Sequence, residues 1–239
     1  MTRFQRYAIY VMPDGALARF GAGWLGWDAL AGRAAEHPVI TGLPRPLAEI
    51  TATPRKYGLH ATIKPPFRLA DTTSLAALMT DIAALCDRLE PVMLDGLTLA
   101  RLGGFLALVP DGQSAALHDL AASAVTRLDH HRARLTDSEL ARRRTARLTP
   151  AQEALLMQWG YPHVLDEFRF HITLTGRLPR EEADTVAEAL APYLTPLLPR
   201  PYPVDSLCLM GEDDQGLFHL VHRYPLGSSV SRSSTATSA

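Results

Sequence analysis

The stretch "YGLHATIKPPF" at residues 57–67 determines how the rest of the chain is interpreted. Its apolar residues alternate around a β-branched threonine, which predicts a strand, and residues two apart in a strand point to the same face. His60 and Thr62 are therefore expected to share a face. The stretch "FRFHITLTGRL" at residues 168–178 repeats this arrangement with His171 and Thr173.

The two stretches agree beyond the His-x-Thr pattern itself. With 9 histidines and 19 threonines in 239 residues, chance alone gives this pattern about 0.7 times, so two bare matches mean little. Both stretches, however, have an aromatic residue three places before the histidine, apolar residues on either side of it, and an aliphatic residue after the threonine. The shared context indicates related segments.

The predicted order of elements also repeats. The order strand, helix, strand, strand occurs at residues 58–109 and again at residues 169–224, with amphipathic helices over 72–89 and 179–194. A repeat of about fifty residues that occurs twice predicts two related lobes rather than a solenoid, which needs at least three units. Each lobe is expected to present one histidine and one threonine to a shared cleft.

We therefore expect an α+β fold with two pseudo-symmetric lobes, each an antiparallel sheet backed by helices, and the active-site cleft between them. The expected boundaries are residues 1–110 for the first lobe and 111–226 for the second. Residues 227–239, "GSSVSRSSTATSA", form a low-complexity tail that is expected to be disordered.

Composition narrows the possible functions. The chain is 47% hydrophobic and has a formal net charge of −1, so no field of the whole molecule attracts nucleic acid or an anionic membrane. Its two cysteines, Cys86 and Cys208, give neither a disulfide framework nor a metal-ligand pattern. No apolar run approaches the roughly 20 residues of a membrane span. A cytoplasmic protein that contacts no membrane is expected.

Two histidines facing one cleft suit the cleavage of a phosphodiester. In-line displacement needs a base on the attacking oxygen and an acid on the leaving oxygen, and histidine can do either near neutral pH because its reference pKa is about 6.5. The hydroxyls of Thr62 and Thr173 can donate hydrogen bonds to the non-bridging phosphate oxygens. This chemistry requires no metal and no cofactor, so none is predicted.

The paired motif, with "RYAIYVMP" near the start and "WGYP" before the second histidine, resembles the two-histidine phosphoesterase superfamily. The likeness is greatest for its branch associated with phosphonate-metabolism operons and extends to about Tyr224. The resemblance implies that His60 and His171 are catalytic and that Thr62 and Thr173 bind phosphate. It also implies a substrate such as a ribose cyclic phosphate or another phosphorylated sugar.

Other polar residues are weaker candidates. Strand alternation places Lys64 on the face of His60 and Thr62, so it is predicted to bind phosphate, and Thr175 holds the equivalent place in the second motif. Arg6 and Tyr7 alternate on the first strand, and the sequence does not decide which of them faces the cleft.

Two further groups of residues are given no part in the predicted site. The basic run "ARRRTAR", which ends at Arg147, could contact a polyanion, but it is interpreted as a solvated helix end or linker, because it lacks the interleaved aromatics that stack bases. His130 and His131 are adjacent, so on a helix they diverge, and no metal site is predicted.

The sequence thus predicts a metal-free phosphodiesterase that acts on a cyclic phosphate of a nucleotide or sugar, with an RNA 2′,3′-cyclic phosphate end as a competing substrate. The alternative is a non-catalytic protein that binds nucleotides or RNA in the same cleft. The sequence does not decide which histidine is the acid, nor the direction of the reaction.

Overall fold

The computed structural model describes residues 4–145 and 147–227. Of the predicted tail at 227–239, residues 228–239 lie outside the described residues. Eleven strands are described: β1 (Arg6–Val11), β2 (Trp27–Asp28), β3 (Arg33–Ala34), β4 (Ala61–Phe67), β5 (Val92–Leu94), β6 (Leu97–Leu102), β7 (Phe105–Pro110), β8 (Ile172–Thr173), β9 (Tyr202–Val204), β10 (Ser206–Glu212) and β11 (Phe218–Pro225).

The described residues also form eight α-helices and three short 3-10 helices. The α-helices are α1 (Gly15–Leu25), α2 (Leu47–Ile50), α3 (Ala52–Arg55), α4 (Leu75–Cys86), α5 (Ala115–Arg127), α6 (Asp137–Arg144), α7 (Pro150–Trp159) and α8 (Arg180–Leu194). The 3-10 helices are η1 (Asp129–His131), η2 (Leu165–Glu167) and η3 (Thr195–Leu197).

The helix ends follow local sequence signals. Ser74 caps α4 by accepting a hydrogen bond from the backbone of Ala77. Thr149 forms a capping box with Gln152 at the start of α7, which has Pro150 at its first position. Gly160 ends α7 in the left-handed conformation with φ of 74°, which costs glycine little because it has no Cβ.

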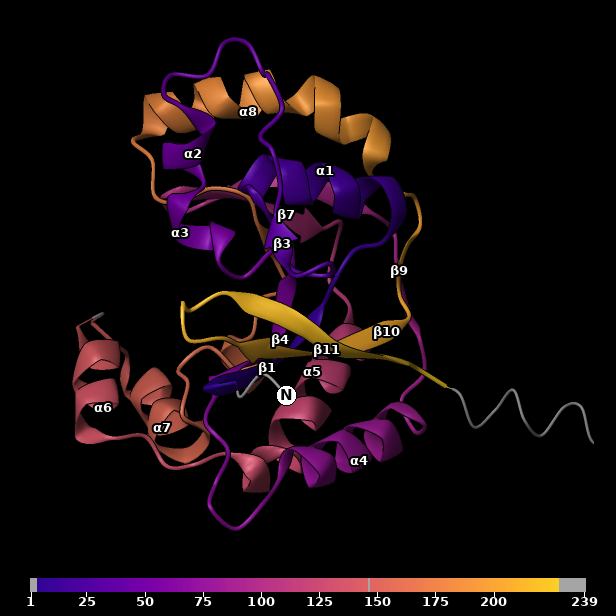
Figure 1. Cartoon of the computed structure of the whole chain (residues 1–239), viewed down its shortest axis with the longest axis vertical. Coiled ribbons are helices and arrows are strands. Elements are labelled where there is room, and N and C mark those ends of the chain that lie inside the picture. The colour runs from indigo at the N-terminus through magenta and orange to yellow at the C-terminus, as the bar shows by residue number, and fades with distance from the viewer. Residues whose placement is uncertain (1–3, 146, 228–239) are drawn as a thin grey trace, which may run out of the picture.

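Seven strands form one antiparallel sheet in the order β11-β10-β1-β4-β8-β7-β6, and two small pairs, β2-β3 and β5-β9, stand apart from it. The prediction of antiparallel strands backed by helices is confirmed. Figure 1 shows α4 and α5 on one side of β1, β4, β10 and β11, whereas α1 and α8 lie at the opposite end of the molecule near β7. The pair α6 and α7 lies to one side of the other helices.

The lobes differ from the sequence-based expectation in two respects. Their strands form one continuous sheet, joined where β4 pairs with β8 at Ala61 and Ile172. In addition, the two halves exchange hairpins, since β10 and β11 join the half that contains β4, and β6 and β7 join the half that contains β8. A boundary at residue 110 therefore does not match the sheet. The sequence periodicity identified the strands but carried no information on these long-range pairings.

A buried apolar core covers the face of the sheet that packs against the helices. Ile9, Ala61 and Ile172 contribute to it from three neighbouring strands. Trp24 of α1 ties that helix to the second histidine strand, because its indole Nε1 donates to the carbonyl of Leu174 at 2.7 Å. Among the described residues, no helix is long and apolar enough to cross a bilayer.

Candidate active site

The two histidine motifs meet at the centre of the sheet. Ala61 and Ile172 are register partners and point into the core, so the residues on either side of each point to the opposite face. Continued by one residue in each direction, the antiparallel register sets His60 opposite Thr173 and Thr62 opposite His171. All four side chains line one cavity.

Both imidazoles are oriented in the same way. Nδ1 of His60 lies 3.0 Å from the carbonyl oxygen of Gly58, and Nδ1 of His171 lies 2.7 Å from the carbonyl oxygen of Arg169. A carbonyl only accepts, so each Nδ1 carries the proton and the Nε2 of the neutral ring is left as an acceptor. His60 Nε2 lies 3.1 Å from the hydroxyl of Thr62.

A left-handed glycine allows the first of these contacts. Gly58 has φ of 70°, and a Cβ at this position would lie 2.5 Å from the Cβ of Ala29. Only glycine fits both the turn and the close approach. The turn aims the Gly58 carbonyl at the ring of His60 and thereby fixes its tautomer.

His60 is the more enclosed of the two histidines. The ring of Tyr10 stacks on it with centroids 3.8 Å apart, and Tyr57 lies 5.7 Å away. Burial lowers the pKa of His60 to about 4, the hydrogen bond to Gly58 opposes this change, and the charge of His171 adds to it. His60 is therefore neutral near pH 7. The hydroxyl of buried Tyr10 has no hydrogen-bond partner among the described residues.

The cavity has a volume of about 520 Å³ and is strongly basic. Five cationic side chains line it, whereas no Asp or Glu does so in the described part of the chain. The cationic residues are Arg6, Lys56, Arg142, Arg143 and Arg177. A cavity of this charge suits an anionic ligand.

A second cavity, also about 520 Å³, adjoins the first. The two share five lining residues, Thr62, Pro65, Phe105, Tyr161 and His171, so together they form a continuous depression on both sides of His171. The part beyond His171 is lined by His163, Phe168 and Glu167, among others, and can hold the remainder of a substrate.

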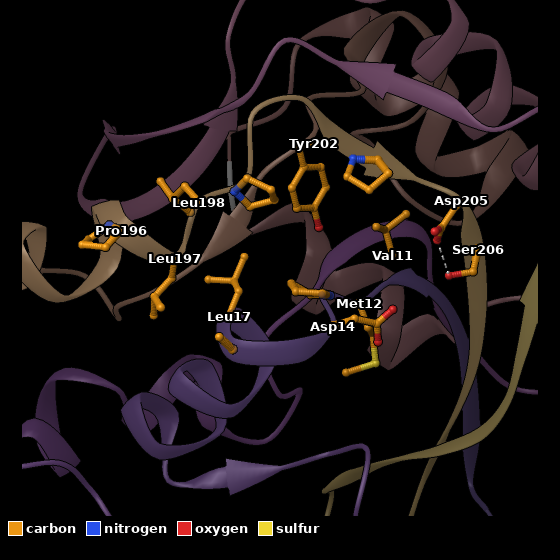
Figure 2. Close-up of a pocket in the computed structure, with 14 residues that line it drawn as sticks. Val11, Met12, Asp14, Leu17, Pro196, Leu197, Leu198, Tyr202, Asp205 and Ser206 are labelled. Atoms are coloured by element: carbon orange, nitrogen blue, oxygen red, sulfur yellow. Dashed lines mark hydrogen bonds between the residues drawn. The ribbon is translucent and has the colours of Figure 1, made fainter.

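A third pocket, of about 330 Å³, is separate from the histidines and is shown in Figure 2. Leu17, Leu197, Leu198 and Tyr202 give it a largely apolar wall, and Asp205 and Ser206 stand at one side. No cationic side chain among the described residues lines it. It therefore lacks the groups that phosphate chemistry requires.

Lys64 does not reach the cavity, which corrects the sequence-based prediction that it binds phosphate. Tyr10 pairs with Thr62 but Ile9 pairs with Lys64, so a β-bulge inserts one extra residue into β4. The bulge turns Lys64 to the core side, where it is 2% exposed. There its Nζ donates to the carbonyl of Val125 and to Asp129, both at 3.1 Å.

The structure also shows where the other weaker candidates, Thr175, Arg6 and Tyr7, lie. Thr175 lies at the cavity wall but is buried, and its hydroxyl accepts from the backbone of Leu106 at 3.0 Å and donates to the carbonyl of Gly176 at 2.8 Å. Of the alternating pair on β1, Arg6 lines the cavity and Tyr7 belongs to the core on the other face.

The basic run is more than a solvated helix end, because Arg142 and Arg143 on α6 line the cavity. Sequence reasoning missed them because α6 is held beside the site by polar contacts with Arg68 and Glu153, which no local pattern reveals. Tyr161 of the "WGYP" segment also lines the cavity, and the guanidinium of Arg143 lies 5.0 Å from its ring centroid. The only sequence signal for Arg142 and Arg143 was the unusual density of arginine in this run.

His130 and His131 do not diverge as predicted. They lie in the short 3-10 helix η1 with ring centroids 4.0 Å apart, and the Nε2 atoms of both contact the same oxygen of Asp81, at 3.0 and 2.9 Å. These three ligand-type side chains lie within 4.8 Å of one another. None of them lines the histidine cavity.

Two threonines on the adjacent strands β4 and β8, with a histidine just before each strand, form the kind of site that the resemblance to two-histidine phosphoesterases implied. The chain belongs to the family described as "Protein of unknown function (DUF1045)", whose model matches residues 62–219. That match contains His171 and Thr173 and begins two residues after His60.

Two curated relatives both carry the name ribose 1,5-bisphosphate phosphokinase PhnN. The protein from Janthinobacterium sp. (strain Marseille) is 37% identical over 218 residues, which cover 88% of this chain and 48% of the relative. That from Laribacter hongkongensis (strain HLHK9) is 34% identical over 239 residues, which cover 96% and 55%. The chain thus spans about half the length of these relatives.

Among solved structures, the chain is similar to E. coli LigT complexed with NADP+, with a TM-score of 0.44 and 14% identity over 94% of this chain and 99% of that chain. LigT complexed with 3′-AMP matches over the same shares with a TM-score of 0.42 and the same identity. A likeness at this level transfers no activity to this chain.

Proposed function

We propose that this protein is a phosphodiesterase that hydrolyses a cyclic or bridging phosphodiester by acid–base catalysis with His60 and His171. The observation that carries the proposal is the placement of both histidines on one basic cavity, with each Nδ1 bound to a backbone carbonyl. The Nε2 of His60 lies 3.1 Å from the hydroxyl of Thr62, a contact that the attacking water replaces in the reaction. The hydroxyls of Thr62 and Thr173, each opposite the histidine of the other motif, donate hydrogen bonds to the phosphate oxygens.

The enclosed position of His60 assigns it the role of the base, and His171 takes the remaining role of the acid. Neutral His60 accepts a proton at Nε2 from the attacking water as the new oxygen–phosphorus bond forms. As the phosphorus–oxygen bond to the leaving group breaks, protonated His171 donates a proton from Nε2 to that oxygen. The products are a phosphate monoester and an alcohol, and both histidines return to their starting forms by proton exchange with solvent.

The class of substrate is proposed from chemistry. The name of both relatives includes a sugar bisphosphate, ribose 1,5-bisphosphate. Hydrolysis of a cyclic phosphate on a sugar that already bears a phosphate yields a compound of that kind. A cyclic phosphate of a sugar or nucleotide is therefore the substrate to test first, with an RNA 2′,3′-cyclic phosphate end as a second candidate.

The test is the turnover of a nucleoside 2′,3′-cyclic phosphate by the wild type, His60→Ala and His171→Ala. Each variant is expected to lose about 10²- to 10⁴-fold in kcat, because general acid–base catalysis by one group contributes about that much. His222→Ala is the matched control, since His222 is exposed on β11 and lines none of the cavities described above.

Turnover that is retained in each of the two single variants would overturn the proposal. Activity abolished by a chelator would also overturn it and would indicate metal-dependent chemistry. Tight binding of nucleotides without turnover would instead favour the alternative, a non-catalytic binding protein that uses the same cavity.

A further inference from the structure

One end of the basic cavity is more cationic than the proposed reaction requires. Arg6 lines it from β1, and Arg142 and Arg143 line it from α6. Arg143 lies beside the ring of Tyr161, which also lines the cavity. We call these four residues the arginine end of the cavity. None of them belongs to β4 or β8, which contain Thr62 and Thr173 and begin one residue after His60 and His171.

Charge pairing distinguishes these arginines from their neighbour. Arg144, the next residue on α6, forms an ion pair with Glu153 and does not line the cavity. Arg142 and Arg143 form no ion pair with the residues that the structure describes. Arg6 is paired with Glu212, which neutralises only one of the three guanidinium groups.

Arg143 has the features of an anion-binding residue without a bound partner in the described part of the chain. Its Nε is buried and has no hydrogen-bond partner among the described residues, although it lines a cavity. Burial lowers the pKa of Arg143, and the charges of Arg142 and Arg6 lower it further. Holding like charges close together without a counterion costs free energy, and a bound anion at this place would recover it.

The helix that carries these arginines is held in place by polar contacts. α6 has no buried side chain among its described residues, so apolar packing does not explain its position. Thr136 and Glu139 form its capping box, Glu139 also accepts from Arg68 at 3.1 Å, and Arg144 bonds to Glu153. These contacts hold α6 beside the cavity that Arg142 and Arg143 line.

The charge of the reacting group alone does not account for this arrangement. A phosphodiester carries one negative charge, and the histidines and threonines already surround its expected position. A phosphate monoester carries close to two negative charges at pH 7 and offers three acceptor oxygens. Guanidinium groups match phosphate geometry through paired N–H donors, which a single ammonium does not provide.

We propose that the arginine end binds a second phosphate, so that the substrate is a cyclic phosphodiester on a sugar that also carries a separate phosphate monoester. The part that concerns the diester rests on the proposed function. The part that concerns an anion subsite made by Arg142, Arg143 and Tyr161 beside Arg6 stands on its own.

The test compares two substrates that differ in one group, adenosine 2′,3′-cyclic phosphate and its 5′-phosphorylated form. The wild type is expected to favour the 5′-phosphorylated form about 10- to 100-fold in kcat/KM, since charge-assisted hydrogen bonds contribute about this much. Arg142→Gln with Arg143→Gln is expected to reduce this preference to within about threefold, because the preference is a ratio of two substrates measured on the same variant. Arg127→Gln, which removes one charge from an exposed residue on α5 that does not line the cavity, is expected to keep the preference.

A binding experiment separates the subsite from catalysis. Calorimetry compares adenosine 3′,5′-bisphosphate with adenosine 3′-monophosphate, neither of which contains a diester to hydrolyse. Tighter binding of the bisphosphate by about tenfold or more, lost in the double variant and kept in Arg127→Gln, supports the subsite even when no cyclic substrate is turned over. Equal or undetectable binding of the two ligands by the wild type overturns it, whatever the turnover results are.

Discussion

At the scale of single residues, two near-identical motifs give two different histidines. Each imidazole donates from Nδ1 to a carbonyl two residues earlier in the chain, so the backbone fixes the tautomer in both. The difference lies in what covers the rings. Tyr10 stacks on His60 at 3.8 Å, whereas the nearest aromatic contact of His171 is Phe105 at 5.8 Å.

This difference predicts the pH dependence of the reaction. Because burial holds the pKa of His60 near 4, the base stays neutral as the pH falls through 6.5, and it is lost only as the pH falls through about 4. The acidic limb of kcat/KM, which reports on the free enzyme, is therefore expected near pH 4. It is measured on a cyclic nucleotide between pH 3.5 and 8.

Tyr10→Leu is the variant for this experiment, with its fold checked by thermal unfolding. Removing the stacked ring admits water to His60, which raises the pKa toward 6.5 and moves the acidic limb to higher pH. A wild-type limb near 6.5 that does not move in Tyr10→Leu would contradict the assignment of His60 as the enclosed base.

Strand periodicity alone predicted that His60 and Thr62 share a face, and likewise His171 and Thr173. The face to which each side chain points depends only on alternation along its own segment. The same rule failed two residues later at Lys64. The rule assumes a regular strand, but β1 and β4 pair with one extra residue in β4 between Thr62 and Lys64. No sequence signal for the bulge was recognised, although Pro65 and Pro66, which have no amide hydrogen, follow at once.

At the scale of elements, the bulge changes what Lys64 does. Its ammonium links β4 to the end of α5 and to η1 through Val125 and Asp129. Burial lowers the pKa of Lys64 to about 8, and the charge and hydrogen bond of Asp129 oppose this change. Lys64 therefore holds elements together and takes no part in the cavity.

Two substitutions test this structural role, with stability measured by urea unfolding. Lys64→Met replaces the buried cation with an apolar chain of similar length and is expected to cost at most about 2 kcal/mol and to leave turnover within about threefold. Asp129→Ala leaves the buried ammonium without its counterion and is expected to cost about 3–5 kcal/mol. A loss of turnover above about 100-fold in a folded Lys64→Met protein would restore Lys64 to the phosphate site.

Helix termini were more predictable than strand partners. The signals at Ser74, Thr149 and Gly160 act over three or four residues, so the sequence marks them directly. The placement of α6 beside the cavity depends instead on Arg68 and Glu153, which are distant from one another in sequence. That is why the arginine run could not be assigned to the site from the sequence.

At the scale of the whole molecule, the internal repeat predicted two similar halves but not their exchange of hairpins. The exchange leaves the two histidine strands adjacent at the centre of a single sheet, with one hairpin at each edge. The site therefore lies where the halves join. Its geometry depends on the pairing of Ala61 with Ile172 more than on either half alone.

Charge is distributed very unevenly over this chain. The formal net charge is −1, yet five cationic side chains and no acidic ones from the described residues line the histidine cavity. The attraction for anions is thus confined to one place. Such a local field favours a small anion that enters the cavity over a long polyanion that needs a basic track on the surface.

Two measurements across a salt series test this distribution of charge. For a small cyclic phosphate, kcat/KM is expected to fall about 3- to 10-fold between 50 and 500 mM salt, because screening shortens the reach of the cavity's charges. For single-stranded RNA, binding is expected to be weak, and the slope of log K against log salt is expected to lie between 0 and about −2, since few phosphates can reach the cavity at once. Tight RNA binding with a slope of about −4 or steeper would contradict this view and would make a polynucleotide the natural ligand.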